Sequence, residues 1–392
     1  MNLKKTNYFN FLQDVLLITL TAFGGPQAHL AVFHQVFVQK RGYLSESELL
    51  ELNALCQILP GPSSTQTLTA IAYKKGGVWL ALLTLLVWIF PAFVLMTSFA
   101  IGIDYFQKQH FDLQFMRLVH HIAIAFMIHS AWQLNQKTIQ SKTALFIFLL
   151  SLGLSYFFPN PYIFPVILVL GGLMSSYKFD QQPKQSHQVL HIKWNYLLWY
   201  GSVFVGFAVL GGLTNSLPIR LFENFYRNGS LIFGGGQVLV PALYNEFVEF
   251  KNYLTADEFL SGYALVQAIP GPVFSFSAYI GALSMRHEGI LGSILGGLVA
   301  TVGINLAGTF LIFFVINFWE GLKKYRFVRA SLEGITAAAA GMMVTAVLLL
   351  LPNLEFSWLN LLVMGIVLFL RIFSTISAPY LIAAGLVIGF LF

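Results

Sequence analysis

The stretch Gln57-Ile-Leu-Pro-Gly-Pro-Ser-Ser-Thr-Gln-Thr67 places a helix-breaking triplet inside an otherwise apolar part of the chain. Pro60 and Pro62 each remove a backbone donor, and their rings clash with the carbonyl four residues earlier, so a regular helix cannot continue through the triplet. The break exposes polar backbone, which a membrane tolerates only where the segment is buried in protein or lines a water-filled cavity. The triplet is therefore the leading candidate for a binding site.

The composition predicts an all-α polytopic membrane protein. Hydrophobic residues make up 57% of the chain and charged residues 10%, with a mean hydropathy of +0.73, whereas soluble domains carry about 25% charged residues. The first apolar run lacks a small-residue cleavage site, which predicts a retained span. A single cysteine, Cys56, excludes an intrachain disulfide and a cysteine metal cluster. The net charge of +6 lies mostly in short loops, and nothing indicates nucleic-acid binding.

Several apolar runs are long enough to cross about 30 Å of hydrocarbon as helices. They lie at residues 9–31, 77–103, 115–135, 194–213, 219–246, 289–318 and 327–351. Shorter runs predict tight helical hairpins, at residues 143–158, 161–177, 357–372 and 375–392. Two further segments, 46–73 and 256–285, each contain a Pro-Gly-Pro triplet and are predicted to be broken helices.

The triplets belong to an internal repeat with a constant offset of 210 residues. Residues 23–62 and 233–272 are identical at 16 of 40 positions without a gap. Such self-similarity indicates a duplicated unit. The predicted organisation is a first repeat at 1–177, a polar linker at 178–193, a connecting transmembrane helix at 194–213 and a second repeat at 214–392.

The placement of Lys and Arg indicates the orientation of the repeats. If each broken segment crosses the membrane, there are about 13 spans, the repeats are inverted, and 15 basic residues lie in cytoplasmic loops against 6 outside. If the broken segments are re-entrant and the connecting helix crosses, the repeats are parallel and the best division is 11 to 10. Re-entrant segments with the connector in the interface also give inversion, but leave an apolar run outside the hydrocarbon. The charges favour two inverted repeats.

The first triplet has the features of an anion site. Pro62 suits the first position of a following helix, where its missing donor costs nothing. The amide groups of Ser63, Ser64 and Thr65 would then face the break at the positive end of the helix dipole, with three hydroxyl groups beside them. Small oxyanions bind to donors of this kind. The alternative is a kink that serves only helix packing.

The second triplet, Pro270-Gly271-Pro272, offers fewer donors. Val273 and Phe274 replace the two serines, and only Ser275 and Ser277 remain. We therefore expect the two repeats to differ in chemistry, with the anion held mainly by the first.

Two glycine motifs, Phe23-Gly-Gly-Pro-Gln27 and Phe233-Gly-Gly-Gly-Gln237, lie inside predicted spans. Consecutive glycines allow either close helix packing or a second local unwinding. Gln27 and Gln237 would either bind the substrate or satisfy carbonyl groups freed by the break in the other repeat. The sequence leaves these alternatives open. The predicted substrate-binding residues are Gly24, Gly25, Gln27, Pro60, Gly61, Pro62, Ser63, Ser64, Thr65, Arg227, Gly234, Gly235, Gly236, Gln237, Pro270, Gly271, Pro272 and Ser275.

Ionisable residues within apolar spans are functional candidates by default. Arg227 would either attract the anion or extend to the membrane interface. Other side chains are candidates for proton coupling, with structural hydrogen bonding or helix capping as the alternative role. They are His29, His34, Glu48, Glu246 and Glu258.

No catalytic motif is present. The chain lacks a nucleotide-binding loop, a His-Glu-x-x-His motif and a Gly-x-Ser-x-Gly motif, so it is not predicted to be an enzyme. His120, His121 and His129 share one span without Glu or Cys at ligand spacing, so neither a metal site nor another cofactor is predicted. Transport would have to use an ion gradient or the gradient of the substrate itself.

With these motifs the sequence resembles the chromate transporter family in its long, two-domain form. The resemblance rests on Phe-Gly-Gly-Pro-Gln-Ala-His at 23–29, Arg-Gly-Tyr-Leu-Ser at 41–45 with Glu48, Leu-Cys-Gln-Ile-Leu-Pro-Gly-Pro at 55–62, Phe-Gly-Gly-Gly-Gln at 233–237 and Ala-Ile-Pro-Gly-Pro at 268–272. In the family, a basic residue and a glycine shortly precede the second glycine motif, as do Arg227 and Gly229. The first half departs from the comparable pattern with Leu17-Ile-Thr19, so only one half supplies a fixed positive charge.

The resemblance implies a multi-pass protein of the bacterial inner membrane that exports chromate. We expect a secondary active transporter that works by alternating access, with a small inorganic oxyanion and membrane lipid as its partners, and a homodimer as the default oligomer. The alternatives are a carrier for sulfate or another oxyanion, and an anion channel that shares the same helix-end site.

Overall fold

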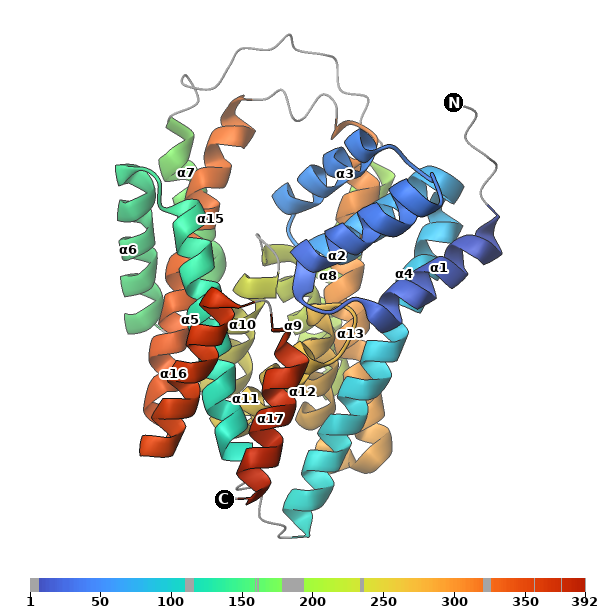
Figure 1. The fold of residues 1–392 in the computed structure, drawn as a ribbon. Helices are drawn as coiled ribbons and strands as arrows, with labels where there is room; N and C mark the ends of the chain where they lie inside the picture. The colour runs from blue at the N-terminus through green and yellow to red at the C-terminus, as the bar shows by residue number, and fades with distance from the viewer. Residues whose placement is uncertain are drawn as a thin grey trace. The chain divides into compact units, whose positions relative to one another are not determined.

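The computed structural model describes residues 7–109, 116–158, 160, 162–177, 194–232, 236–319, 326–355, 357–374 and 376–391 (Figure 1). Within these ranges the regular secondary structure is helical and contains no strand. The prediction of an all-helical protein is thereby confirmed for the described part of the chain. The predicted polar linker, 178–193, lies outside it.

Within the described ranges, four helices are long and apolar enough to cross a membrane. They are α4 (Ser63–Lys108), α8 (Asn195–Thr214), the segment Arg286–Val315 that includes α13 (Gly289–Val315), and Ala330–Leu350 within α15 (Arg326–Leu350). Shorter apolar helices occupy the predicted hairpins, among them α6 (Lys142–Phe157), α7 (Ile163–Ser176), α16 (Trp358–Phe373) and α17 (Ala378–Leu391). The chain is a multi-pass membrane protein.

The helices form two compact units, and each unit contains segments from both halves of the sequence. Unit 1 comprises Met1–Tyr105, Ile192–Gly236 and Val266–Asn317. Within it, α13 packs against α8, α9 and α12. Its other described elements are α1 (Tyr8–Thr21), α2 (Gly25–Phe33), the π-helix η1 (His34–Lys40), α3 (Glu46–Ile58), α9 (Leu217–Leu231), the short 3-10 turn η5 (Val273–Ser275), α12 (Phe276–Ser284) and η6 (Arg286–Glu288).

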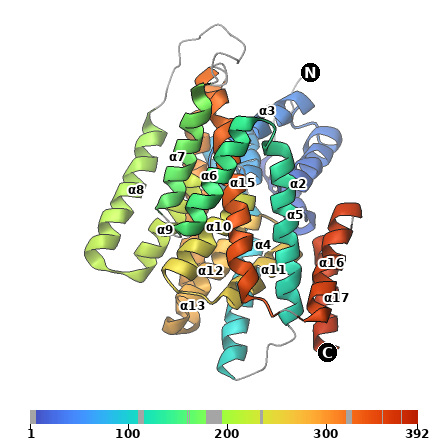
Figure 2. The same ribbon diagram turned by 90° about the vertical axis from the view of Figure 1, so that its left-hand side faces the viewer.

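Unit 2 comprises Phe106–His191, Gln237–Leu265 and Phe318–Phe392. In this unit α15 packs against α5 (Arg117–Thr138), α6 and α7 (Figure 2), and α5 also contacts α16 and α17. Its remaining described elements are most of α10 (Gly236–Tyr244), the π-helix η4 (Asn245–Phe250), most of α11 (Ala256–Ala268) and η7 (Leu351–Asn353).

Equivalent secondary-structure elements in the two halves are separated by the 210-residue offset found in the sequence. Helices α3 and α11 begin and end 210 residues apart. Before each helix, Gly42 and Asn252 both take the left-handed conformation, with φ of 62° and 52°. In unit 1, α4 beyond Gly77 runs in the opposite direction to its counterpart α13, and in unit 2 α5 runs opposite to α15 (Figure 1). Equivalent helices within each unit are therefore antiparallel.

Two predicted spans are interrupted. The run 9–31 is divided because α1 ends at Thr21 and α2 begins at Gly25, with Gly24 and Gly25 at φ of 96° and 80°. Of the two alternatives for the first glycine motif, the structure has the local unwinding. The run 219–246 is likewise divided between α9 and α10, and residues 233–235 between them are not described.

Helix packing in unit 2 depends on small residues. A Cβ added to Gly334 of α15 would lie 1.8 Å from the carbonyl oxygen of Gly171 in α7. Nearby, Ser175 donates its hydroxyl to the Ser331 carbonyl at 3.2 Å and accepts from the Gly334 amide at 3.0 Å. These contacts require the two backbones to touch, as is common between transmembrane helices.

We predict that Gly334→Ala lowers the midpoint of thermal unfolding in detergent, because forcing a methyl group into this contact costs about 1–3 kcal/mol. Gly153→Ala in α6 is the matched control, since the space around its Cβ position is open. This second change should leave the midpoint unchanged or raise it, because Ala favours a helix over Gly by about 1 kcal/mol. Equal midpoints for the two variants would contradict the proposed packing.

Candidate functional site

Both Pro-Gly-Pro triplets interrupt helices. In the first, α3 ends at Ile58 and α4 begins at Ser63; in the second, α11 ends at Ala268 and η5 begins at Val273. The central glycines, Gly61 and Gly271, have φ of 119° and 104°. Residues with a Cβ rarely adopt these values, which explains why glycine lies between the two prolines.

Each triplet is hydrogen-bonded to the break that follows the first helix of the other repeat. The Gly61 amide donates to the Ile232 carbonyl at 2.7 Å, and the Gly271 amide donates to the Ala22 carbonyl at 3.0 Å. Ala22 and Ile232 are themselves related by the 210-residue offset, so the same contact is made twice, as across a local twofold axis. All four residues belong to unit 1. We refer to the two hydrogen bonds as the reciprocal clasp.

The clasp satisfies polar groups that the breaks set free. Ala22 and Ile232 are the C-caps of α1 and α9, and their amides donate back to the Ile18 carbonyl at 2.8 Å and the Asn228 carbonyl at 3.1 Å. The carbonyl groups of these two residues lie at the ends of their helices, where no amide of the same helix follows to donate to them. An unpaired polar group in a membrane costs several kcal/mol, so the clasp strongly favours bringing the breaks together.

The start of α4 keeps the donors expected of an anion site. The first helical hydrogen bond runs from the Gln66 amide to the Pro62 carbonyl at 2.8 Å, so the amides of Ser63, Ser64 and Thr65 precede the hydrogen-bond ladder. All three residues are buried. Buried donors at a helix N-terminus favour a negatively charged group.

Two side chains that the sequence did not single out hold this end in place. The Gln66 amide nitrogen donates to the Pro60 carbonyl at 2.8 Å and to the Gly308 carbonyl at 3.2 Å, which ties the break to α13. The Trp88 indole nitrogen donates to the Thr65 hydroxyl at 3.0 Å. Position 276, which corresponds to Gln66, is phenylalanine, so the sequence alone could have indicated this asymmetry.

The second triplet is surrounded differently. The Ser275 hydroxyl donates to the Pro272 carbonyl at 2.7 Å, within its own turn. Ser277 likewise donates to Phe274 at 2.7 Å. Pro270 is half-buried, and Gly271 and Pro272 are buried.

Arg227 lies in α9 with a carboxylate beside it. Its Nε donates to the Glu223 carboxylate at 3.0 Å and one terminal nitrogen donates to the Asn224 side chain at 3.2 Å. The Arg227 and Glu223 side chains are only 11% and 19% exposed. Glu223 was missed at the sequence level, although its spacing of four residues is the one that allows ion pairs on a helix.

Gly24 and Gly25 form the unwound turn already described, and Gly236 begins α10. The structure does not settle the roles of the other predicted residues of the glycine motifs. Gly234 and Gly235 lie outside the described residues, as do the side chains of Gln27 and Gln237. Their roles remain predictions.

Two proton-coupling candidates are helix caps. The Glu48 carboxylate accepts from the Ser45 amide at 2.9 Å, and the Glu48 amide donates back to the Ser45 hydroxyl at 3.2 Å. Thr255 and Glu258 make the same pair of contacts at 2.9 Å and 3.2 Å. Both glutamates thus have the capping role that the sequence offered as the alternative.

The remaining candidates fall into three environments. Glu246 is fully buried and pairs with the Lys251 ammonium at 3.1 Å. His34 is partly exposed and lies 3.6 Å from the Glu46 carboxylate. His29 is fully buried, and neither ring nitrogen has a hydrogen-bond partner among the described residues.

A polar cluster fixes the loop before α3 to α1. The buried Asp14 carboxylate accepts from Arg41 at 2.6 Å and from the Tyr43 hydroxyl at 2.8 Å. Burial and this hydrogen bond raise the pKa of Tyr43 to about 12. Tyr43 therefore stays protonated at neutral pH and continues to donate.

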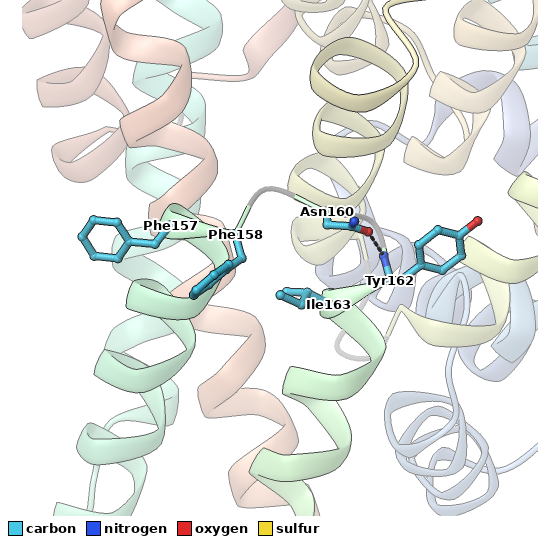
Figure 3. Close-up of a pocket in the computed structure, with 5 residues that line it drawn as sticks. All are labelled: Phe157, Phe158, Asn160, Tyr162 and Ile163. Carbon is cyan, nitrogen blue, oxygen red and sulfur yellow. Dashed lines mark hydrogen bonds between the residues drawn. The ribbon is translucent and has the colours of Figure 1, made fainter.

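Unit 2 offers no comparable anion site among its described residues. His120 contacts the Ser261 hydroxyl at 2.8 Å and the Asp257 carboxylate at 3.5 Å, and no group of three metal-ligating side chains occurs in the described ranges. A surface depression at the turn between α6 and α7 is lined by Phe157, Phe158, Asn160, Tyr162 and Ile163 (Figure 3). None of these side chains is charged, so the depression does not suit an oxyanion.

Buried helix breaks inside a multi-pass membrane protein whose described residues are helical occur at the substrate sites of many transporters. A family model described as chromate transporter matches residues 9–176 and 219–390. The chain therefore belongs to the chromate transporter family, whose members transport chromate.

Relatives match over most of their length. A probable chromate transport protein of Synechococcus elongatus is 27% identical over 349 residues, which cover 86% of this chain and 83% of the relative. The chromate transport protein of Cupriavidus metallidurans is 23% identical, with 94% and 88% covered. An uncharacterized transporter of Methanocaldococcus jannaschii is 23% identical, with 97% and 94% covered. No solved structure matches the chain.

The clasp predicts that Gly61→Ala and Gly271→Ala each lower the thermal midpoint and weaken anion binding. An added Cβ would lie 3.2 Å from the Gly308 backbone in the first case and 3.3 Å from Ala92 in the second, besides the strain of a positive φ. Gly42→Ala is the control, because Gly42 has a positive φ but open space around it. If Gly42→Ala has as large an effect as the other two, crowding at the clasp is not the cause.

Proposed function

We propose that this protein is a secondary active transporter that exports chromate across the bacterial inner membrane by alternating access. The class of substrate follows from membership of the chromate transporter family. The direction, the energy source and the mechanism belong to the proposal. The organisation into a first repeat at 1–177, a linker, a connecting helix and a second repeat at 214–392 is also part of it.

The observation that carries the proposal is the reciprocal clasp between Gly61 and Ile232 and between Gly271 and Ala22. It brings the breaks of both repeats into one buried region that includes the N-terminus of α4. A tetrahedral dianion placed there would accept hydrogen bonds from the Ser63, Ser64 and Thr65 amides.

Alternating access is supported by the relation between the repeats. Equivalent helices run antiparallel within each unit (Figure 1), and the positive charges divide 15 to 6 when the repeats are inverted. Two inverted repeats can exchange conformations, so that a state open to one side becomes its counterpart open to the other. In the proposed cycle the clasp is the pivot about which the repeats rock.

Other residues have assigned roles in this proposal. Gly24, Gly25 and Gly236 give the backbone access to the substrate, and Gln27 and Gln237 add amide donors. Pro60, Gly61 and Pro62 shape one wall, while Pro270, Gly271, Pro272 and Ser275 shape the opposite wall. Arg227 supplies the fixed positive charge.

Two other functions use the same site. A carrier for sulfate or another oxyanion would show the stronger competition by that anion in uptake assays. An anion channel would pass ions without saturation and without a dependence on a counter-ion, which recordings in a planar bilayer would reveal. Saturable flux favours the carrier.

The test of the proposed site is chromate flux into proteoliposomes. The double change Ser63→Ala and Ser64→Ala should raise KM for chromate about tenfold to a hundredfold, because a hydrogen bond to a charged group contributes about 1.5–3 kcal/mol. Ser176→Ala is the control, since that buried hydroxyl only donates to the Leu173 carbonyl of its own helix. An unchanged KM in the double variant would show that the two hydroxyl groups do not bind the anion.

The Arg227–Glu223 pair leads to opposite expectations for its two members. Arg227→Gln should weaken chromate binding about tenfold or more, because it removes a charge-assisted donor. Glu223→Gln should tighten binding, since it removes a carboxylate that competes with the anion for the guanidinium. Binding to purified protein can be measured by titration calorimetry. If both variants lose affinity equally, the pair has a structural role and does not bind the anion.

A further inference from the structure

His29 differs from every other proton-coupling candidate in having no partner. Two of the glutamates are helix caps, Glu246 has Lys251, and His34 has Glu46. His29 is 0% exposed, yet Nδ1 and Nε2 both lack a hydrogen bond among the described residues. A buried donor or acceptor left unpaired costs about 1–3 kcal/mol, so a ring kept in this state requires an explanation.

The ring lies where the helix breaks meet. The Ala22 backbone interacts with the ring without forming a hydrogen bond of normal geometry, and its carbonyl accepts from the Gly271 amide in the clasp. On another side, the ring is edge-on to the Trp88 indole, with ring centres 5.2 Å apart. The Trp88 nitrogen in turn donates to the Thr65 hydroxyl at the N-terminus of α4. His29 is thus linked through Ala22 to the second Pro-Gly-Pro triplet, and through Trp88 to the helix end that follows the first.

No charged group shares this environment. From α2 the ring faces Phe33, at 6.5 Å between ring centres, and from α4 it faces Trp88. From α1 it faces only the Ala22 backbone, and among the described residues no carboxylate or cationic side chain interacts with it. The arrival of a dianion at the adjacent helix end would therefore be the largest electrostatic change that the imidazole experiences.

We propose that His29 is the proton site of the transporter, which takes up one proton when the oxyanion binds and gives it up when the anion leaves. The proton comes from bulk water and bonds to the ring nitrogen that lacks one, so the imidazole becomes an imidazolium beside the dianion. The assignment rests on the proposed function and makes it specific: one proton accompanies each dianion, and the bound pair carries one negative charge less than the anion alone.

The site occurs once in the chain. Position 239, which corresponds to His29, is leucine, and position 300, which corresponds to Trp88 after the two-residue shift at the Gly77 and Gly289 kinks, is alanine. Only the first repeat has an imidazole (His29) next to an indole (Trp88) that donates to a hydroxyl group (Thr65). Proton binding is thus assigned to the same repeat as the anion-binding helix end.

Thermodynamic linkage fixes the sign of the pH dependence. Because the anion-bound state holds one more proton than the free state, anion affinity should fall as the pH rises, by up to about tenfold for each pH unit. Sulfate is a suitable probe beside chromate, because sulfate remains a dianion throughout the range of about pH 5 to pH 8 in which histidine titrates.

The test is titration calorimetry of the purified full-length protein with chromate and with sulfate, in two buffers of different ionisation enthalpy. The difference in heat gives the number of protons taken up for each anion bound. The wild type should take up close to one proton, and His29→Gln should take up none and lose the pH dependence of affinity. His34→Gln is the matched control and should behave as the wild type, because His34 is partly exposed and already paired with Glu46.

His29→Asn is a second variant in case the glutamine variant does not fold, and it should give the same result. If the anion binds but no proton is taken up by the wild type, or if both His29 variants keep the uptake, the inference is wrong while the proposed function stands. If neither anion binds to the wild type, the proposed function fails and the proton assignment fails with it.

Discussion

Two backbone hydrogen bonds, from Gly61 to Ile232 and from Gly271 to Ala22, join the breaks of the two repeats. Each helix break frees polar groups that lipid cannot satisfy, and for the Ala22 and Ile232 carbonyls the partner lies in the other repeat. The two helix breaks that each hydrogen bond joins therefore stabilise one another. In this setting the buried amides at the start of α4 remain available to an anion.

The repeats share a backbone but differ in chemistry. After the first triplet, Ser63, Ser64 and Thr65 lie at the start of a long helix, and Gln66 fixes the break to α13. After the second triplet comes a three-residue 3-10 turn whose Ser275 hydroxyl donates within its own turn. The symmetry positions the two walls, while the substitutions decide which wall offers donors. Duplication followed by divergence on one side accounts for both features.

Much of this architecture was predictable from the sequence. The apolar runs placed most helices, because hydrophobic length and Pro and Gly positions act locally. For the run 9–31 the sequence left two alternatives open, because consecutive glycines permit close helix packing as well as local unwinding. The partner of Arg227 and the lack of a hydrogen-bond partner for His29 were not predicted. A side chain's partner depends on which helix faces it, and hydropathy does not report that.

The sequence by itself determined the membrane class, the 210-residue repeat and the positions of the Pro-Gly-Pro breaks, because proline and glycine restrict the backbone wherever they occur. Tertiary structure alone decided that Gly61 reaches Ile232, that Glu223 accompanies Arg227 in a buried setting, and that His29 is left without a partner. These outcomes depend on contacts between segments far apart in the chain, where burial removes water as an alternative partner and makes each pairing, or its absence, energetically important.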